Sequence, residues 1–269
     1  MGHTRLGTLP KTRAWKDVVS VYAGADASPP ERTDFGHEVA RVADSAMQAA
    51  AAALKAARGD RGVAHVFFLL TQIALAARRQ DPEGALWEIG ISLPPDASRL
   101  DLSAEVNRAL DDHFLGAGGA PSDLAEMAQL ALAETLASWF RGRPSDLFAS
   151  PREQFWGDLR ALGTQMAFGG IARQFFGNLI GRLLGFHLSR VVRPGEGQSL
   201  IGDAGDLTRF NDELRRHALE RALVVRDFAG GWFSKTEFER GIDPSNVRRF
   251  VAHALRKVAA EFRRGADRG

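Results

Sequence analysis

The chain has 269 residues, a formal net charge of +2 and no cysteine, and 45% of its residues are hydrophobic. This composition is typical of a soluble globular protein, and the lack of cysteine excludes disulfides and thiolate metal sites. Residues 1–10 lack the apolar core of a signal peptide, and no uncharged apolar stretch reaches the roughly 18 residues of a membrane span, so we expect a cytoplasmic location without a transmembrane segment.

Charge is distributed unevenly along the chain. Residues 1–150 carry 15 Lys and Arg against 19 Asp and Glu, whereas residues 151–269 carry 20 against 14. Arginine outnumbers lysine by 30 to 5, which fits either pairing with carboxylates and phosphates or a GC-rich genome. We therefore expect a slightly acidic helical half (1–150) and a basic helical half (151–269), with one continuous domain as the alternative.

Helical patterns dominate the chain, and no run alternates between apolar and polar residues. We therefore predict an all-α fold, a globular bundle of roughly ten helices with short connections and no sheet. The helices expected in the first half cover residues 12–22, 34–57, 63–79, 102–114 and 122–141. Thr33 or Asp34, Asp101 and Ser122 are the expected caps, and residues 116–121 form a glycine-rich linker.

The second half of the chain contains a series of small residues at a spacing of four, which we call the glycine ladder. Every fourth residue from Gly157 to Ser189 would share one helix face, and Gly177, Gly181 and Gly185 form its bare centre. Each glycine costs about 1 kcal/mol relative to alanine inside a helix, so close approach of another backbone is expected to compensate. Three partners are considered for this small-residue face: a neighbouring helix of the core, a second copy of the chain, or a membrane surface.

A second feature is the junction expected after a helix over residues 207–229. It contains two glycines followed by two large aromatics: Gly230, Gly231, Trp232 and Phe233. Ser234 and Glu237 have the spacing of a capping box and predict a new short helix. Trp232 and Phe233 are then either core anchors or part of a mobile recognition loop.

The last expected helix has a clear division of faces. Asp243 and Pro244 predict its start, and it runs to about residue 264. Its apolar stripe comprises Val247, Val251, Leu255, Val258 and Phe262. Its basic residues are Arg248, Arg249, Arg256, Lys257, Arg263 and Arg264. This basic face is solvated or salt-bridged, contacts the phosphates of a nucleic acid, or meets an acidic protein.

Two acidic patterns on expected helices raise the question of an enzyme. They comprise Asp111 and Asp112, and Asn211, Asp212 and Glu220. In an all-α chain this arrangement is similar to that of class I terpenoid synthases, which implies magnesium ions that bind a diphosphate. The chain departs from that family's pattern, because a third acid is missing from the first motif and Arg215 and Leu219 replace ligands in the second.

The first functional hypothesis is therefore a non-enzymatic interaction or scaffold subunit of a cytoplasmic bacterial complex. It would bind a protein partner or form a homo-oligomer through Gly177, Gly181, Gly185, Trp232 and Phe233. The alternative is an accessory protein that binds nucleic acid through the basic residues of the last helix. A magnesium-dependent enzyme similar to terpenoid synthases is the remote alternative. We expect no catalytic residue, no cofactor and no metal ion.

Overall fold

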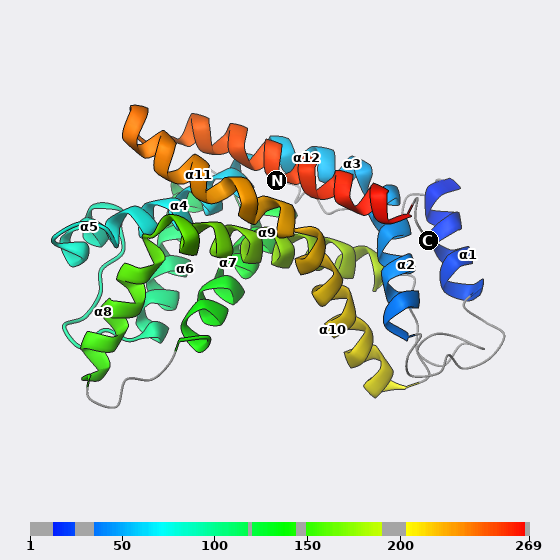
Figure 1. Cartoon of the computed structure of the whole chain (residues 1–269), viewed down its shortest axis with the longest axis horizontal. Coiled ribbons are helices and arrows are strands. Elements are labelled where there is room, and N and C mark those ends of the chain that lie inside the picture. The colour runs from blue at the N-terminus through cyan, green and yellow to red at the C-terminus, as the bar shows by residue number, and fades with distance from the viewer. Residues whose placement is uncertain (1–12, 25–34, 118–119, 144–148, 190–202, 267–269) are drawn as a thin grey trace.

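A computed structural model describes residues 13–24, 35–117, 120–143, 149–189 and 203–266 of the chain (Figure 1). Over these residues it contains twelve helices and no strand, which confirms the predicted all-α fold. The helices are α1 (Arg13–Gly24), α2 (Phe35–Ala49), α3 (Ala51–Gly59), α4 (Arg61–Ala76), α5 (Pro82–Glu88), α6 (Arg99–Gly116), α7 (Asp123–Arg141), α8 (Pro151–Leu162), α9 (Gln165–Leu188), α10 (Ala204–Arg221), α11 (Leu223–Arg240) and α12 (Pro244–Ala266).

Helix α9 is the central element of the fold. It packs mainly against α7, α10 and α11 (Figure 1). Phe168, Phe175 and Phe176 of α9 surround Phe67 of α4 at ring-centroid distances of 6.1, 5.2 and 5.1 Å, and Phe250 of α12 stacks on Phe67 at 5.4 Å. Buried residues from both halves of the chain thus belong to one hydrophobic core. The boundary near residue 150 stays a prediction.

Short polar side chains begin most of these helices, because their oxygens accept from free backbone N–H groups of the first turn. The Ser122 hydroxyl accepts from the Ala125 amide at 3.1 Å, as predicted for α7. Asp60 caps α4 by accepting from the Val63 amide at 2.9 Å. The Ser122 hydroxyl also donates to Asp60 at 2.7 Å, so the starts of α4 and α7 are linked.

Helix α6 begins about one turn earlier in the sequence than predicted. Ser98, not Asp101, is the cap of this helix. The Asp101 carboxylate accepts from the Ser98 amide at 2.8 Å and the Ser98 hydroxyl accepts from the Asp101 amide at 3.4 Å, which is a capping box. Hydrogen bonds from Ser98 lower the pKa of Asp101.

The glycine ladder does not run along one helix as predicted. Helix α8 ends at Leu162 and α9 begins at Gln165, so Gly157 is separated from the glycines of α9. Thr164 caps α9 by accepting from the Ala167 amide at 3.2 Å. The Arg78 guanidinium donates to the Gly163 carbonyl oxygen and occupies this break.

The expected junction at Gly230 and Gly231 is also absent. Helix α10 ends at Arg221, and α11 continues through both glycines and through Ser234 to Arg240. The capping box predicted at Ser234 and Glu237 is therefore wrong, since both residues lie inside α11. Inside α11, Gly230 lies where this helix crosses the start of α9: a Cβ on it would lie 3.2 Å from the Gln165 carbonyl carbon, so the position requires a glycine.

The helix expected over residues 34–57 is divided at Ala50 into α2 and α3. Helical hydrogen bonds nevertheless continue through the division, from Ala50 N to Ala46 O (2.8 Å) and from Leu54 N to Ala50 O (2.9 Å). Thr33 and Asp34, the expected caps, lie outside the described residues. Part of the linker at 116–121 does so as well.

Candidate basic surface

The start of α12 is fixed by a reciprocal cap. Asp243 accepts from the amides of Ser245 and Asn246 at 2.7 and 2.8 Å, and Asn246 returns a contact by accepting from the Asp243 amide at 3.2 Å. The hydrogen bond from the Asn246 amide, those from Ser245 and the charge of Arg249 lower the pKa of Asp243. Asn246 is buried and donates to the Gly241 carbonyl at 3.0 Å. These contacts confirm the predicted start of the helix.

The apolar face of α12 determines which side of the helix is exposed. The predicted apolar residues are all buried: Val247, Val251, Leu255, Val258 and Phe262. The helix packs on α2, α3 and α4 and lies along the top of the molecule in Figure 1. Because burial fixes this side inward, the opposite side of the helix faces solvent along its length.

All six predicted basic residues occupy that outer side. The structure brings them together and leaves each of them exposed: Arg248, Arg249, Arg256, Lys257, Arg263 and Arg264. They recur every seven or eight residues, which corresponds to about 11 Å along a helix. From Arg248 to Arg263 the row extends about 22 Å at the helical rise per residue. We call this row the basic stripe.

The basic stripe differs from the arginines of α10 in its ion pairs. Each arginine of α10 has a carboxylate partner: Arg209 with Asp206, Arg215 with Glu134, Arg216 with Glu213 and Glu220, and Arg221 with Asp44. In the basic stripe, within the described part of the chain, only Arg264 makes an ion pair, to Glu261. Two arginine-rich helices of one fold thus differ, because α10 is neutralised and α12 keeps its positive charge.

The surroundings of the stripe add to this charge. Helix α3 packs beside α12 and presents the exposed Lys55 and the half-buried Arg58, with no acidic residue in its sequence. Burial, together with the charges of Arg256 and Lys257, lowers the pKa of His253. Arg256 also approaches His253 Nδ1 at 3.4 Å. The stripe and α3 together form a positively charged surface that attracts anions.

The residues of the interface hypothesis lie in different surroundings. Gly177 is buried against Leu219 of α10, and Phe233 is buried and stacks on Phe168 at 3.9 Å. Gly181, Gly185 and Trp232 are half-buried; a Cβ on Gly181 would lie 3.8 Å from Ala218, whereas none of the described atoms lies within 4 Å of one on Gly185. Trp232 stacks on Phe250 at 4.1 Å.

The five residues of the interface hypothesis thus fall into two groups, two buried and three half-buried. The groove at Gly177 is filled by this chain's own α10, and the ring of Phe233 is part of the core. An interface with another molecule stays a prediction for the three half-buried residues, Gly181, Gly185 and Trp232.

The acidic patterns that resemble terpenoid synthase motifs are engaged in local contacts. Asp111 accepts from Gln129 at 3.1 Å, and Glu220 accepts from Arg216 at 2.6 Å. Asp112 accepts from Arg108 at 2.7 Å. Among the described residues, no three His, Cys, Asp or Glu side chains are grouped so that they could hold a metal ion.

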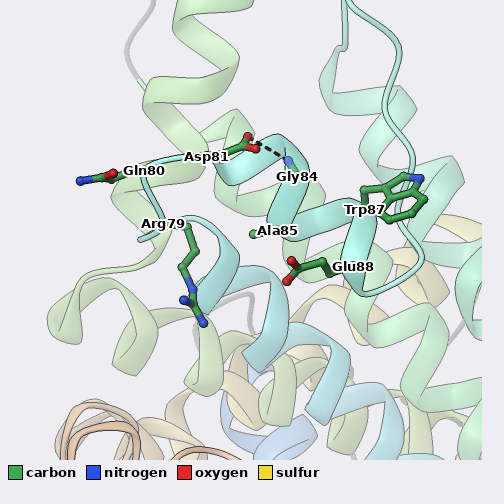
Figure 2. Close-up of a pocket in the computed structure, with 7 residues that line it drawn as sticks. All are labelled: Arg79, Gln80, Asp81, Gly84, Ala85, Trp87 and Glu88. Atoms are coloured by element: carbon green, nitrogen blue, oxygen red, sulfur yellow. Dashed lines mark hydrogen bonds between the residues drawn. The ribbon is translucent and has the colours of Figure 1, made fainter.

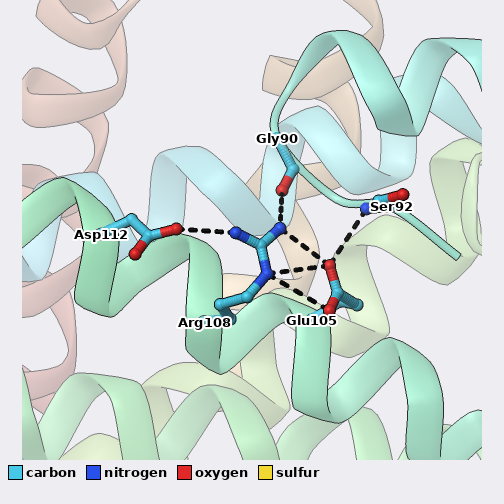
Figure 3. A network of polar contacts seen from close by, with 5 residues as sticks. All are labelled: Gly90, Ser92, Glu105, Arg108 and Asp112. Atoms are coloured by element: carbon cyan, nitrogen blue, oxygen red, sulfur yellow. Dashed lines mark hydrogen bonds and ion pairs between the residues drawn. The ribbon is translucent and has the colours of Figure 1, made fainter.

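Arg108 organises a polar network that sequence reasoning missed (Figure 3). Besides Asp112, its guanidinium donates to Glu105 at 2.8 Å and to the Gly90 carbonyl at 2.7 Å, and the Ser92 amide donates to Glu105 at 3.2 Å. The hydrogen bond from Arg108 lowers the pKa of Glu105. These contacts hold the segment after α5 against α6, which is a structural role.

A surface pocket of about 550 Å³ lies around α5 (Figure 2). Asp81 in its wall is used as a helix cap, because it accepts from the Gly84 amide at 2.9 Å. Trp87 points outward and is 71% exposed. The remaining polar side chains, among them Arg79 and Glu88, do not converge on one point (Figure 2). The pocket therefore offers no set of groups aimed at one ligand.

No protein-family model, curated protein or solved structure matches this chain. No helix in the described ranges combines the length and the apolar character that a membrane crossing requires. The function is therefore inferred from the chain's own residues, and the basic stripe is the surface feature with the most specific chemistry.

Proposed function

We propose that the protein binds nucleic acid through the basic stripe of α12 and the adjoining basic residues of α3. The observation that carries this proposal is the contrast between α10, where every arginine has a carboxylate partner, and α12, where Arg264 alone of the six basic residues has one among the described residues. Exposed cations that form no ion pair with the described residues are available to neutralise phosphates, and release of condensed counterions then drives association.

Burial of the apolar side of α12 supports the same proposal. A helix with its apolar face in the core cannot turn that face to a lipid surface or to a partner groove, as amphipathic binding helices do. Its contribution to binding comes from the exposed side, which is almost entirely cationic. The lysine-poor, arginine-rich composition also suits phosphate, because the guanidinium donates two parallel hydrogen bonds.

Charge reversal on the stripe tests the proposal. We expect the double variant Arg249→Glu with Arg256→Glu to weaken duplex binding at least tenfold, because two phosphates are then no longer neutralised and fewer counterions are released. The matched control is Arg141→Glu with Arg160→Glu, which makes the same change in net charge at exposed arginines of α7 and α8. Binding is measured by fluorescence anisotropy, and circular dichroism checks folding.

Two outcomes would contradict this function. Equal reductions of affinity in the stripe variant and in the control would show that net charge alone decides binding. Equal affinity for polyglutamate and for DNA at the same salt concentration would assign the stripe to an acidic protein partner.

A second candidate is the non-enzymatic interaction subunit. Met166 of α9 and Phe238 of α11 support it, because these large apolar side chains are 87% and 91% exposed on the helices that also carry Gly185 and Trp232. Both candidates take the bacterial cytoplasm as the site of action. Light-scattering mass at low and high salt distinguishes them: a salt-independent dimer supports this candidate, and a monomer that gains mass only with DNA supports the first.

A further inference from the structure

The outer face of α12 has a composition that bears on the kind of nucleic acid, a question that rests on the proposed function. Between the basic pairs of the stripe lie five half-buried residues: Ala252, His253, Ala259, Ala260 and Glu261, the last of which pairs with Arg264. The imidazole of His253 packs edge-on against Phe228 with the ring centroids 5.1 Å apart. From Arg248 to Arg264, the side chains of α12 that are exposed rather than buried or half-buried are arginine and lysine only.

This composition lacks the groups that recognise single strands. Proteins that bind single-stranded nucleic acid stack the unpaired bases on exposed aromatic side chains. The aromatic residues of α12, Phe250 and Phe262, are both buried, and α3 consists of alanine, leucine, glycine, Lys55 and Arg58. A single strand would therefore meet cations on α12 and α3 without an exposed aromatic ring on which its bases could stack.

The same face has few groups suited to reading bases. Asn and Gln recognise adenine by paired hydrogen bonds, and Asn246, the one amide side chain of α12, is buried and committed to the helix start. The cations could reach guanine only if α12 entered the major groove. The contacts of α12 with α2, α3, α4 and α11 leave only its outer side available to a ligand. On that side the exposed groups are cations, whose most abundant partners on a nucleic acid are the phosphates.

The length of the stripe fits a double helix. The row from Arg248 to Arg263 extends about 22 Å, and a duplex carries one phosphate charge per roughly 1.7 Å of its axis, twice the density of one of its strands. The backbone of α12 and the duplex are both ordered before they meet, whereas a flexible single strand loses additional conformational freedom on binding.

We infer that the ligand of this surface is a nucleic-acid duplex, held by its sugar–phosphate backbone along α12 and α3 without preference for base sequence. Arg248, Arg249, Arg256, Lys257 and Arg263 supply the principal phosphate contacts. Lys55 of α3 extends the contact to the side of the stripe.

The test uses the full chain and labelled DNA of about 20 nucleotides, a length that exceeds the stripe. The probes are an AT-rich duplex, a GC-rich duplex and a single strand, each titrated from about 50 to 200 mM NaCl, over which phosphate-driven affinity falls steeply. We expect the two duplexes to bind within about threefold of each other and the single strand about tenfold or more weaker.

A variant of α3 adds a readout that is independent of the absolute affinity. We expect Lys55→Glu to reduce the slope of log K against log salt by about one unit, as is expected when one fewer phosphate is neutralised. The matched control, Lys235→Glu, alters a 75% exposed lysine of α11 that belongs to neither α12 nor α3 and pairs with Glu239, and it is expected to leave the slope unchanged.

The outcomes separate the two proposals. Absence of binding to all three probes overturns the proposed function itself. Binding in which the single strand is less than about tenfold weaker, or in which the two duplexes differ by more than about threefold, leaves the function standing and overturns the duplex inference. An unchanged slope in Lys55→Glu removes α3 from the surface.

Discussion

The side chain of Leu219 in α10 fills the space that Gly177 leaves in α9. A Cβ built on Gly177 would lie 2.5 Å from Leu219 Cδ2 and 3.0 Å from Leu219 Cα. The guanidinium of Arg173, one turn before Gly177, donates to the Leu219 carbonyl at 3.1 Å. The glycine at position 177 therefore allows the backbones of α9 and α10 to approach closely. This contact within the chain is the packing that offsets the cost of a glycine inside a helix.

The first prediction compares two glycines of α9. We expect Gly177→Ala to reduce the free energy of unfolding by about 1–3 kcal/mol, because the new methyl group meets a backbone atom that cannot move alone. Gly185→Ala should instead be neutral or stabilising by up to about 1 kcal/mol, since no described atom lies within 4 Å of its Cβ. Urea denaturation measures both. Equal effects at the two sites would refute the role of Leu219.

The second prediction uses two adjacent glycines of α11. A Cβ on Gly230 would clash with the carbonyl oxygen of Gln165 at the start of α9, whereas one on Gly231 meets none of the described atoms within 4 Å. We expect Gly230→Ala to lower the thermal midpoint by several degrees, in line with an overpacking cost of about 1–3 kcal/mol. Gly231→Ala should not lower it. A stable Gly230→Ala protein would argue against the close crossing of α9 and α11.

The third prediction concerns a buried polar cluster between α2 and α10. Asp44 is 6% exposed and contacts His217 Nε2 at 2.7 Å, and Arg221 donates to it at 3.0 Å. Asp44→Ala removes the acceptor of both groups, so we expect a decrease of about 3 kcal/mol in the free energy of unfolding.

The control for this cluster is Glu220→Ala, which breaks an ion pair with Arg216 in which both side chains are about half exposed, at 53% and 55%. We expect a change of no more than about 0.5 kcal/mol there. A similar small change in Asp44→Ala, measured by the same urea titration, would show that the cluster contributes little to stability.

The fourth prediction is a pH dependence that arises at His65. Its ring stacks on that of His113 with the centroids 3.3 Å apart, and burial, followed by the charge of His113, lowers the pKa of His65 to about 4. Between about pH 6.5 and 4 the unfolded chain binds a proton at this site that the folded chain does not, so stability falls as the pH decreases through that window.

Urea midpoints measured at several pH values across that window check this expectation. His65→Gln removes the titrating group, and its stability should therefore change less with pH than that of the wild-type protein. Parallel curves for the two proteins would assign the acid sensitivity to other residues.

Local signals in the sequence were sufficient to predict several elements. Ser122 and Asp243 were recognised as caps because their side chains satisfy amides only two or three residues away, and such contacts need no tertiary partner. The apolar stripe of α12 and its six exposed basic residues followed from helical periodicity in the same way.

Two of the predictions that failed concern contacts between segments far apart in the chain. Gly230 and Gly231 resemble a helix end in sequence, but the crossing with α9 near Gln165 makes a bare backbone necessary inside α11. The ladder was interrupted at Gly163, where Arg78 of a distant segment occupies the break.

The sequence by itself determined the all-α class, the caps of α7 and α12 and the composition of the basic stripe, because helix periodicity and capping act within a few residues. Only the tertiary structure decided that Leu219 fills the groove at Gly177. It also decided that Arg215 and Arg221 of α10 pair with Glu134 and Asp44, whereas among the described residues the basic stripe has no pair beyond that of Arg264. The physical reason is that ion pairs such as Arg221 with Asp44 join residues distant in the chain, and their formation depends on how the helices pack.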